Sequence, residues 1–555
     1  MPSSGSRSGG TVSSTIESLR QSRVPSAYMP GIHRVLALPT RQGNAPDQTS
    51  RYSLPGGRHT LRPVQSNALY ELQQCNGLVA PIGVGHGKFL ISALAPTALG
   101  SERPLLLVPP ALVNQTKKEI AKFREHFRIH PDLRVLSYGK LSVAAGARLL
   151  SDYRPDLIIA DECHHLRHRT AARTKRVIRY FQDNPSTKFV GLSGTFTSHG
   201  LVDYAHLVEL ALREGSPVPL DFWELQIWAA NLDVGGEPDL YERQQFCPLT
   251  VQYGGTPRQA FFSRFESCPG VTLTRDVSSG ASIYMQREDI DLPEEVDQAL
   301  RELDRTWCTP GGEEIEDALT MARYRRQLLC GFYYEWVWPN DAPDYRWLEA
   351  RAHWHQQVRR VLKRSKEGRD SPLLVAIWAQ RDDCSDYTLV RAWRAWDEVR
   401  HRPLPPVRTV WISDYLIHRV MRFLRAAAHP TIVWCEHRAL LEAFEAEGLP
   451  TYGAGSEIPD TQQSHCAMSI KAHGTGKNLQ RWSHNLLTAF LPNGSTLEQL
   501  IGRTHRQGQQ ADEVYVHYFE QHPSVLVDIE KAREIARYIQ DTQGNRMKIL
   551  AATWI

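Results

Sequence analysis

Short apolar runs alternate with amphipathic stretches along the first half of the chain. The alternation extends from Leu61 to about Gly280. Short apolar runs bounded by turn residues are typical of buried strands, and apolar residues spaced three to four apart are typical of helices. Strands are predicted at Gly77–Pro81, Pro104–Val108, Leu133–Ser137, Leu157–Ala160 and Phe189–Leu192. Helices are predicted between them, at Val113–Phe127 and Arg169–Asp183. This order predicts βαβ units and a mostly parallel sheet.

The same alternation returns in the last third of the chain, after the Pro-rich segment Pro403–Pro406. The predicted strands are Thr431–Cys435, Ala467–Ile470, Asn485–Ala489 and Val514–Tyr518. The predicted helices are Ser413–Ala428, Arg438–Glu447, Thr496–Thr504 and Val525–Asp541. Between the two regions, Trp, Tyr and Arg are frequent, and helices are predicted at Glu294–Thr306 and Ile315–Leu329. The fold class is therefore α/β, with two parallel-sheet lobes and a helical insertion between them.

The pattern also predicts the domain boundaries. Residues 1–57 are rich in Ser, Gly, Pro and Arg, which indicates a flexible N-terminal arm with a short strand at Val35–Leu38. The first lobe is expected at residues 58–284, the insertion at 285–404 and the second lobe at 405–555.

Composition narrows the class of protein. With 41% hydrophobic and 23% charged residues, the 555-residue chain is unlike a disordered protein. No apolar run approaches the roughly 20 residues that span a bilayer, and the N-terminus lacks the apolar core of a secretory signal. The nine cysteines contain no C-x-x-C pair, which favours reduced thiols over disulfides or a zinc site. A cytoplasmic protein without a membrane partner is expected.

Charge is distributed unevenly. The net charge is only +4, but Arg351–Arg425 contains sixteen Lys and Arg against eight Asp and Glu. A local excess of Arg suits phosphate binding. A solvated helical face explains the same excess equally well.

A glycine-rich segment follows the first predicted strand. It contains Gly83, Gly85, His86, Gly87 and Lys88 and leads directly into an apolar helix. Glycines allow backbone N–H groups to close around a polyphosphate, and the start of a helix favours negative charge. Lys88 would reach the β- and γ-phosphates of a nucleotide. A plain glycine-rich turn is the alternative.

The segment departs from the P-loop pattern at two positions. Phe89 stands where that pattern has the Ser or Thr that binds Mg²⁺, and Ile82 replaces its first glycine. Phe89 cannot bind a metal. Either water takes that coordination place, or hydrolysis is slow or lost.

An acidic pair, Asp161 and Glu162, ends the strand Leu157–Ala160, and we call it the acidic box. The carboxyl end of a parallel strand faces the ligand crevice. Asp161 would hold Mg²⁺, and Glu162 would orient and deprotonate an attacking water. His164 is assigned to the same box. A capped helix start is the alternative.

Two further motifs follow. Ser193-Gly194-Thr195 comes after the strand Phe189–Leu192, where hydroxyl groups can bind the acidic box. Near the C-terminus, Arg503 and Arg506 are three residues apart and share one helix face. Two guanidinium groups on one face suit a polyphosphate, and an arginine can stabilise the charge of phosphoryl transfer. A basic exposed helix is the alternative.

In this order the motifs resemble helicase superfamily 2, and the RTHRQGQ sequence resembles its Swi/Snf-type DNA translocases. The compact size is similar to that of bacteriophage-encoded members. By this resemblance Gln65 would read the adenine base. Leu105–Pro110, including Pro109, would contact DNA as motif Ia, and Ile432–Glu436 would be motif IV. The other residues that match family motifs are Gly474, Gly476, Asn478 and Leu479 of motif V, and Gln499, Arg503 and Arg506 of motif VI.

The resemblance implies two RecA-like lobes that close on ATP and Mg²⁺. The P-loop and acidic box would come from the first lobe and the arginines from the second. Hydrolysis would move the protein along duplex DNA, usually without full strand separation. In the insertion, Arg359, Arg360, Lys363 and Arg364 are the DNA-binding candidates. Four of its tryptophans (Trp354, Trp378, Trp393 and Trp396) are expected to be mostly core residues.

Two other functions stay open. Phe89 is compatible with a nucleotide-binding scaffold on DNA that hydrolyses ATP weakly or not at all. An RNA-directed motor of the same superfamily is the third hypothesis.

Overall fold

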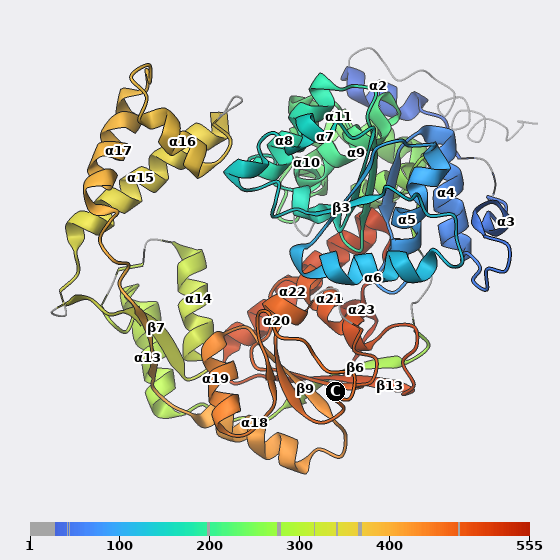
Figure 1. Ribbon diagram of the computed structural model, residues 1–555. Helices are drawn as coiled ribbons and strands as arrows, with labels where there is room; N and C mark the ends of the chain where they lie inside the picture. Colours follow the sequence, from blue (N-terminus) through green and yellow to red (C-terminus); the bar gives the residue numbers. More distant parts are fainter. Residues whose placement is uncertain are drawn as a thin grey trace, which may run out of the picture.

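Two α/β lobes lie one above the other, and a group of helices projects from the second lobe beside them (Figure 1). The computed structural model describes residues 28–555 except residues 42, 44, 197–199, 275–278, 313, 316, 340–341, 365–368 and 475–477. All nine cysteines are free. In the part of the chain described, no helix is long and apolar enough to cross a membrane.

Lobe 1 is built on a five-stranded parallel sheet in the order β1-β5-β4-β2-β3. The strands are β1 (Leu78–Pro81), β2 (Pro104–Val108), β3 (Arg134–Ser137), β4 (Leu157–Asp161) and β5 (Lys188–Ser193). Each predicted strand is confirmed to within one residue at either end. For β1, β2, β4 and β5 the prediction succeeded because helices cover both faces of the sheet and these strands are apolar at nearly every position. The edge strand β3 is only partly buried.

Helices cover the two faces of this sheet. One face packs against α4 (Pro63–Cys75), α5 (Lys88–Leu99) and α6 (Val113–Phe123). The other packs against α8 (Ala172–Asp183) and α9 (Ala205–Leu212), with α7 (Leu149–Tyr153) beside them. Three further helices, α10 (Phe222–Leu232), α11 (Leu240–Tyr253) and α12 (Pro257–Glu266), extend this second layer.

The predicted strand at Val35–Leu38 is wrong. Pro30–Ala37 forms helix α2, in which Pro30 occupies the first turn and Ile32 and Val35 are buried in the core of lobe 1. Val35 O accepts a hydrogen bond from Nε of Arg264 (2.9 Å). A short helix, α3 (Thr49–Tyr52), follows. Helices α2 and α3 therefore pack on lobe 1, and residues 1–27 of the expected flexible arm lie outside the described residues.

Lobe 2 contains a seven-stranded parallel sheet in the order β10-β11-β9-β12-β13-β6-β14. Its strands are β6 (Ser282–Glu288), β9 (Thr431–Cys435), β10 (Thr451–Tyr452), β11 (Cys466–Ser469), β12 (His484–Leu487), β13 (Glu513–Phe519) and β14 (Thr553–Trp554). Its helices are α18 (Tyr415–Ala426), α19 (Arg438–Ala446), α20 (Ile470–His473), α21 (Gly494–Thr504), α22 (Pro523–Gln543) and α23 (Lys548–Ala551). The two lobes with parallel sheets confirm the predicted fold class.

The insertion is nested inside lobe 2, because β6 precedes it in the chain yet pairs with β13 in the lobe 2 sheet. Its first helices, α13 (Glu294–Thr306) and α14 (Ala318–Leu328), share the core of lobe 2. An antiparallel pair, β7 (Phe332–Trp336) and β8 (Val407–Trp411), leads to the projecting helices. These are α15 (Tyr345–Arg364), α16 (Pro372–Ala379) and α17 (Tyr387–Val399). They have a small core of their own that includes Trp354 and Trp393, while Trp378 and Trp396 are partly buried.

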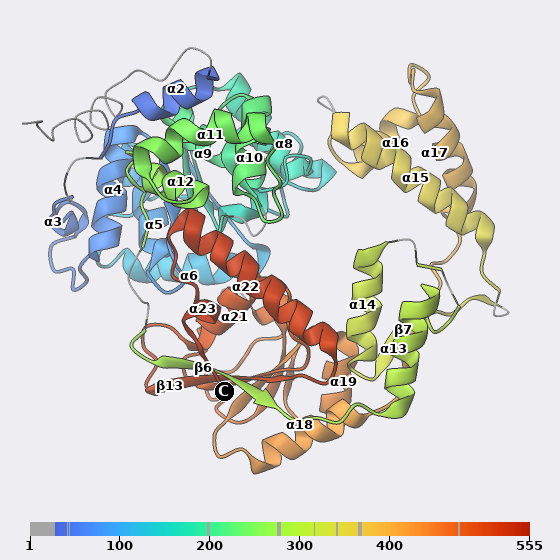
Figure 2. The same ribbon diagram turned by 180° about the vertical axis from the view of Figure 1, so that it is seen from behind.

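The tip of the projecting helices also touches lobe 1, where the segment before α16 lies near α8 (Figures 1 and 2). Asp370 there accepts from Arg176 at 2.8 Å and from Arg179 at 3.1 Å. The side chains of Asp370 and Arg176 are only 1% and 2% exposed. Arg176 also donates to the backbone carbonyls of Leu141 and Val143. The insertion therefore bridges the two lobes through a buried ion pair.

Replacing Asp370 by Asn is expected to release this bridge. An amide cannot balance two guanidinium groups, and breaking a buried ion pair typically costs about 3–5 kcal/mol. Amide hydrogen exchange should become faster in α8 and α16 while the lobe 2 sheet is unaffected. Asp383→Asn is the matched control, since its ion pair with Arg381 in the same helical group is largely exposed. Equal exchange in the two variants would contradict the bridge.

Candidate active site between the two lobes

The glycine-rich loop joins β1 to α5 and is held by the start of α4. Gly85 and Gly87 have φ of +93° and +75°, a backbone region that favours glycine. Nε2 of Gln65 donates to Gly87 O (2.9 Å), and a Cβ at Gly87 would lie 2.5 Å from that nitrogen. Nη1 of Arg62 donates to Gly85 O (3.0 Å). Two side chains from α4 and its N-terminal cap thus fix the loop.

A cavity of about 400 Å³ lies between the loop and lobe 2. Its lining is polar and charged on both sides. Lobe 1 contributes Arg62, Gln65, Gly85, Gly87, Lys88, Phe89, Glu119, Asp161 and Glu162, and lobe 2 contributes Asn478, Arg503 and Arg506. The tertiary structure therefore brings residues more than 300 positions apart to one site.

Lys88 and Glu162 face each other in this cavity. Nζ of Lys88 donates to Ile82 O (3.0 Å) and lies 3.7 Å from Oε1 of Glu162. Glu162, the first residue after β4, has φ 55° and ψ 52°, so its backbone is left-handed and the chain turns directly after the strand. Left-handed non-glycine residues carry strain and are common at functional sites.

The ionisation of the acidic box follows from its surroundings. Burial alone would raise the pKa of the Glu162 carboxyl, but the charge of Lys88 and the hydrogen bond from His164 outweigh it and hold that pKa below its usual range. Burial and the neighbouring charge of Glu162 raise the pKa of Asp161. Glu162 is therefore the carboxylate that stays ionised, and a cation beside Asp161 would favour its ionised form as well.

Arg503 approaches from lobe 2. Its side chain is buried in α21, where Nε donates to Gln499 O (2.9 Å). Burial and the neighbouring Arg506 lower the pKa of Arg503 to about 10, which leaves it charged at neutral pH. Arg506 donates to Oδ1 of Asn478. Gly502 allows α21 to come close, because a Cβ there would lie 2.9 Å from Val84 of the loop.

Comparison with known families gives a match, which lies within lobe 1. Residues 58–198 match the family model described as type III restriction enzyme, res subunit, which is a superfamily 2 helicase-like domain. No curated protein matches the chain. The predicted superfamily is confirmed, and ATP-dependent helicase or translocase activity in general is supported.

The Ser193-Gly194-Thr195 motif of the helicase-like domain also connects the two lobes. Oγ of Ser193 lies 3.0 Å from Nδ1 of His164 and 3.3 Å from Oε2 of Glu162. Two residues further on, Oγ1 of Thr195 shares a hydrogen bond with Oγ of Ser495 (2.7 Å) at the start of α21. The Ser193-Gly194-Thr195 motif thus touches both the acidic box and lobe 2.

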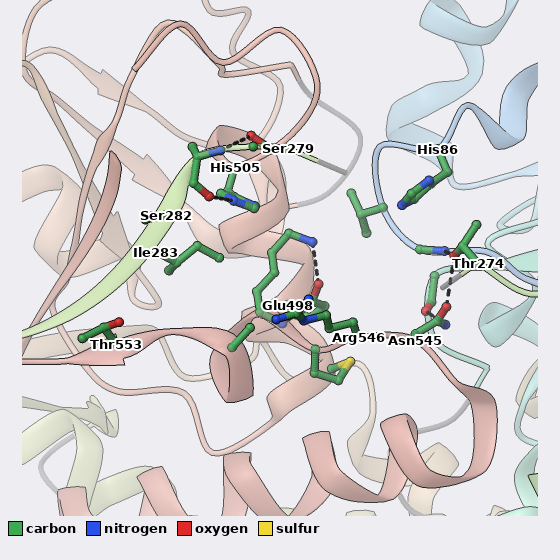
Figure 3. Close-up of a pocket in the computed structure, with 18 residues that line it drawn as sticks. His86, Thr274, Ser279, Ser282, Ile283, Glu498, His505, Asn545, Arg546 and Thr553 are labelled. Atoms are coloured by element: carbon green, nitrogen blue, oxygen red, sulfur yellow. Dashed lines mark hydrogen bonds and ion pairs between the residues drawn. The ribbon is translucent and has the colours of Figure 1, made fainter. Parts of the chain in front are cut away.

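Some predicted residues lie elsewhere. Gly83 and His86 of the helicase-like domain line a second cavity, also about 400 Å³, on the other side of the loop (Figure 3). Gln499 is buried in α21 and contributes its backbone carbonyl to Arg503. Sequence patterns did not indicate Arg62 or Glu119, although Arg62 directly precedes the proline that begins α4.

The DNA-binding candidates are scattered. Pro109 and Gly474 are buried, and Asn478 is exposed beside Arg506. Arg359 is exposed on α15, whereas Arg360 forms an ion pair with Asp386 (2.7 Å). Of the other two motif V residues, Leu479 is buried in the core of lobe 2, and Gly476 lies outside the described residues.

Proposed function

We propose that this protein is a Swi/Snf-type ATP-dependent translocase that moves along duplex DNA. The observation that carries the proposal is the single cavity in which Lys88 and Glu162 of lobe 1 meet Arg503 of lobe 2. A site divided between two lobes can couple the state of the nucleotide to the angle between them. The RTHRQGQ sequence, which contains Arg503 and Arg506, supports the Swi/Snf branch.

Each side chain has a distinct role in hydrolysis. Lys88 neutralises phosphate charge, and the ionised Glu162 takes a proton from the attacking water. The water oxygen bonds to the γ-phosphorus as the bond to the β-phosphate oxygen breaks, which yields ADP and phosphate. Arg503 stabilises the negative charge that develops on the transferred group.

Mg²⁺ would bind at Asp161 and offset phosphate charge. Within the described residues, no group of three or more His, Cys, Asp or Glu side chains is arranged to hold a metal. This fits Mg²⁺, which commonly takes one or two carboxylates together with substrate phosphates and water.

DNA is proposed to bind on the lobe 2 side, outside the nucleotide cavity. A cavity of about 1110 Å³ opens beside Glu436, the last residue of the motif IV segment. Arg323, Arg438 and Trp336 line it, and Arg326 pairs with Glu436 at 3.3 Å. Cationic and aromatic side chains suit a nucleic-acid strand. The other proposed contacts are Gly474 of motif V and Arg359 and Arg360 of the insertion. Pro109 of motif Ia would contact DNA from lobe 1, and Asn478 of motif V would do so from the edge of the nucleotide cavity, which it also lines.

The test is ATP turnover with different nucleic acids. Duplex DNA should stimulate wild-type turnover more than single strands or RNA, and Lys88→Ala should lower the stimulated rate about 100-fold or more, as loss of a charge at a phosphoryl-transfer site typically does. Lys118→Ala, an exposed lysine of the same lobe, is the control. Stronger stimulation by RNA would favour the RNA-directed motor. Turnover that survives Lys88→Ala would refute the assigned site.

A second candidate function, a nucleotide-binding DNA scaffold with little hydrolysis, is favoured by Phe89. Its ring lines the cavity and packs against Phe123 with centroids 5.7 Å apart.

Phe89→Thr should distinguish the two functions. If the missing hydroxyl limits hydrolysis, threonine should raise turnover about tenfold through direct Mg²⁺ ligation. Phe89→Ala, which opens the same space without a ligand, should not. Wild-type turnover at the buffer rate with tight ATP and DNA binding would favour the scaffold. Active wild type that threonine does not accelerate would favour the motor, with water in that coordination place.

A further inference from the structure

The chain makes a buried turn, Gln543-Gly544-Asn545, at the end of α22. Helix α22 runs from lobe 2 up to lobe 1, where it packs against α12 (Figure 2). After the turn the chain returns through α23 to β14, which pairs with β6 in the lobe 2 sheet. Both ends of the turn are therefore anchored in lobe 2, while the turn itself sits in lobe 1.

The turn contacts the Ser193-Gly194-Thr195 motif through its two amide side chains. Oε1 of Gln543 accepts from the backbone N–H of Phe196 (3.0 Å). Nδ2 of Asn545 donates to Gly194 O (2.8 Å). These bonds hold the backbone directly after β5, the same segment that carries Ser193 and Thr195 to the acidic box and to lobe 2.

Asn545 is also connected to the glycine-rich loop, through Thr274. Oγ1 of Thr274 accepts from the backbone N–H of Gly83 (2.8 Å) and donates to Oδ1 of Asn545 (3.3 Å). Figure 3 shows Thr274 and Asn545 side by side in the second cavity, behind the loop. One side chain of lobe 2 is thus connected to the glycine-rich loop, which lines the nucleotide cavity, and to the Ser193-Gly194-Thr195 motif, which contacts the acidic box.

The side chains that make these contacts are buried, and the backbone of the turn favours glycine. Gln543, Asn545 and Thr274 are 1%, 4% and 4% exposed. Gly544 has φ +74°, and a Cβ there would lie 2.5 Å from the ring of Phe262. A buried amide that loses its hydrogen-bond partner is unfavourable, so these hydrogen bonds are strongly favoured when the lobes are together.

We propose that Asn545 and Thr274 are positioning residues that couple the arrangement of the two lobes to the geometry of the glycine-rich loop. The proposal rests on the proposed ATPase function. When lobe 2 moves relative to lobe 1, the turn moves with it. Its hydrogen bonds transmit this movement to Gly83 through Thr274 and to the backbone at Gly194. The glycine-rich loop therefore keeps its catalytic geometry only while the turn remains hydrogen-bonded to lobe 1.

Two substitutions at Thr274 test this role. Thr274→Val has nearly the same shape but lacks the hydroxyl, so kcat with saturating duplex DNA should fall about tenfold while ADP affinity stays within about twofold, because the catalytic geometry is lost and not the pocket. Thr274→Ser retains the hydroxyl and should restore wild-type turnover. Asn545→Leu should match Thr274→Val. Thermal unfolding of each variant checks that it is folded.

Arg546→Ala is the matched control, since Arg546 follows Asn545 in the chain but is exposed. Equal rates in the Val and Ser variants, or wild-type rates in Thr274→Val, would overturn the positioning role. If Asn545→Leu does not fold, the Thr274 pair decides alone. A wild-type protein without Lys88-dependent turnover would overturn the proposed function and this inference together, whereas active wild type with unaffected variants would overturn only the inference.

Discussion

Glu162→Gln is expected to lower DNA-stimulated ATP turnover by about 10²–10⁴-fold, the contribution of a well-placed general base. Lys88 and His164 keep the Glu162 carboxylate ionised, and its left-handed backbone turns it into the inter-lobe cavity. Glutamine has almost the same shape and can still accept from Ser193, but it cannot take a proton. ATP binding should therefore persist while kcat collapses.

Steady-state turnover and binding of a fluorescent ATP analogue would check this prediction. Glu125→Gln, an exposed carboxylate beyond the end of α6, is the control and should behave as wild type. If Glu162→Gln retained turnover within about threefold of wild type, another group would have to act as the base.

Arg503→Ala should be as damaging, by about 10³-fold in kcat, the lower end of what an arginine at a phosphoryl-transfer site contributes. Arg503 is the charged group that lobe 2 places opposite Lys88 and Glu162, and its burial strengthens its effect on charge that develops in the cavity. Arg503→Lys keeps the charge but loses the planar fork, so its turnover should be intermediate.

The control for this prediction is Arg425→Ala, an exposed arginine near the end of α18. Because Arg503 is buried, thermal unfolding must first show that each variant is folded, and the lysine variant keeps the test informative if alanine is unstable. Arg503→Ala with turnover within tenfold of wild type would show that the two lobes do not share one catalytic site.

Local sequence was sufficient wherever a motif and its strand are adjacent in the chain. The glycine-rich loop follows β1 and the acidic box ends β4, so both were placed correctly at the carboxyl edge of the lobe 1 sheet. Strand β6 escaped prediction because only Ile283 and Met285 are buried in it, an alternation too short to distinguish from a loop. Because β6 was not predicted, lobe 2 was predicted to begin after the insertion.

The order of apolar runs by itself determined two α/β lobes, and the spacing of glycines, carboxylates and arginines located the motifs, since burial and backbone freedom act over a few residues. The tertiary structure alone decided that Arg503 meets Glu162, that Asp370 joins the insertion to Arg176, and that Gly83 and His86 face a different cavity from Lys88. It also placed Asn545 behind the glycine-rich loop. These contacts join segments that are far apart in the chain, and they depend on how packed sheets and helices orient their surfaces, which no local pattern encodes.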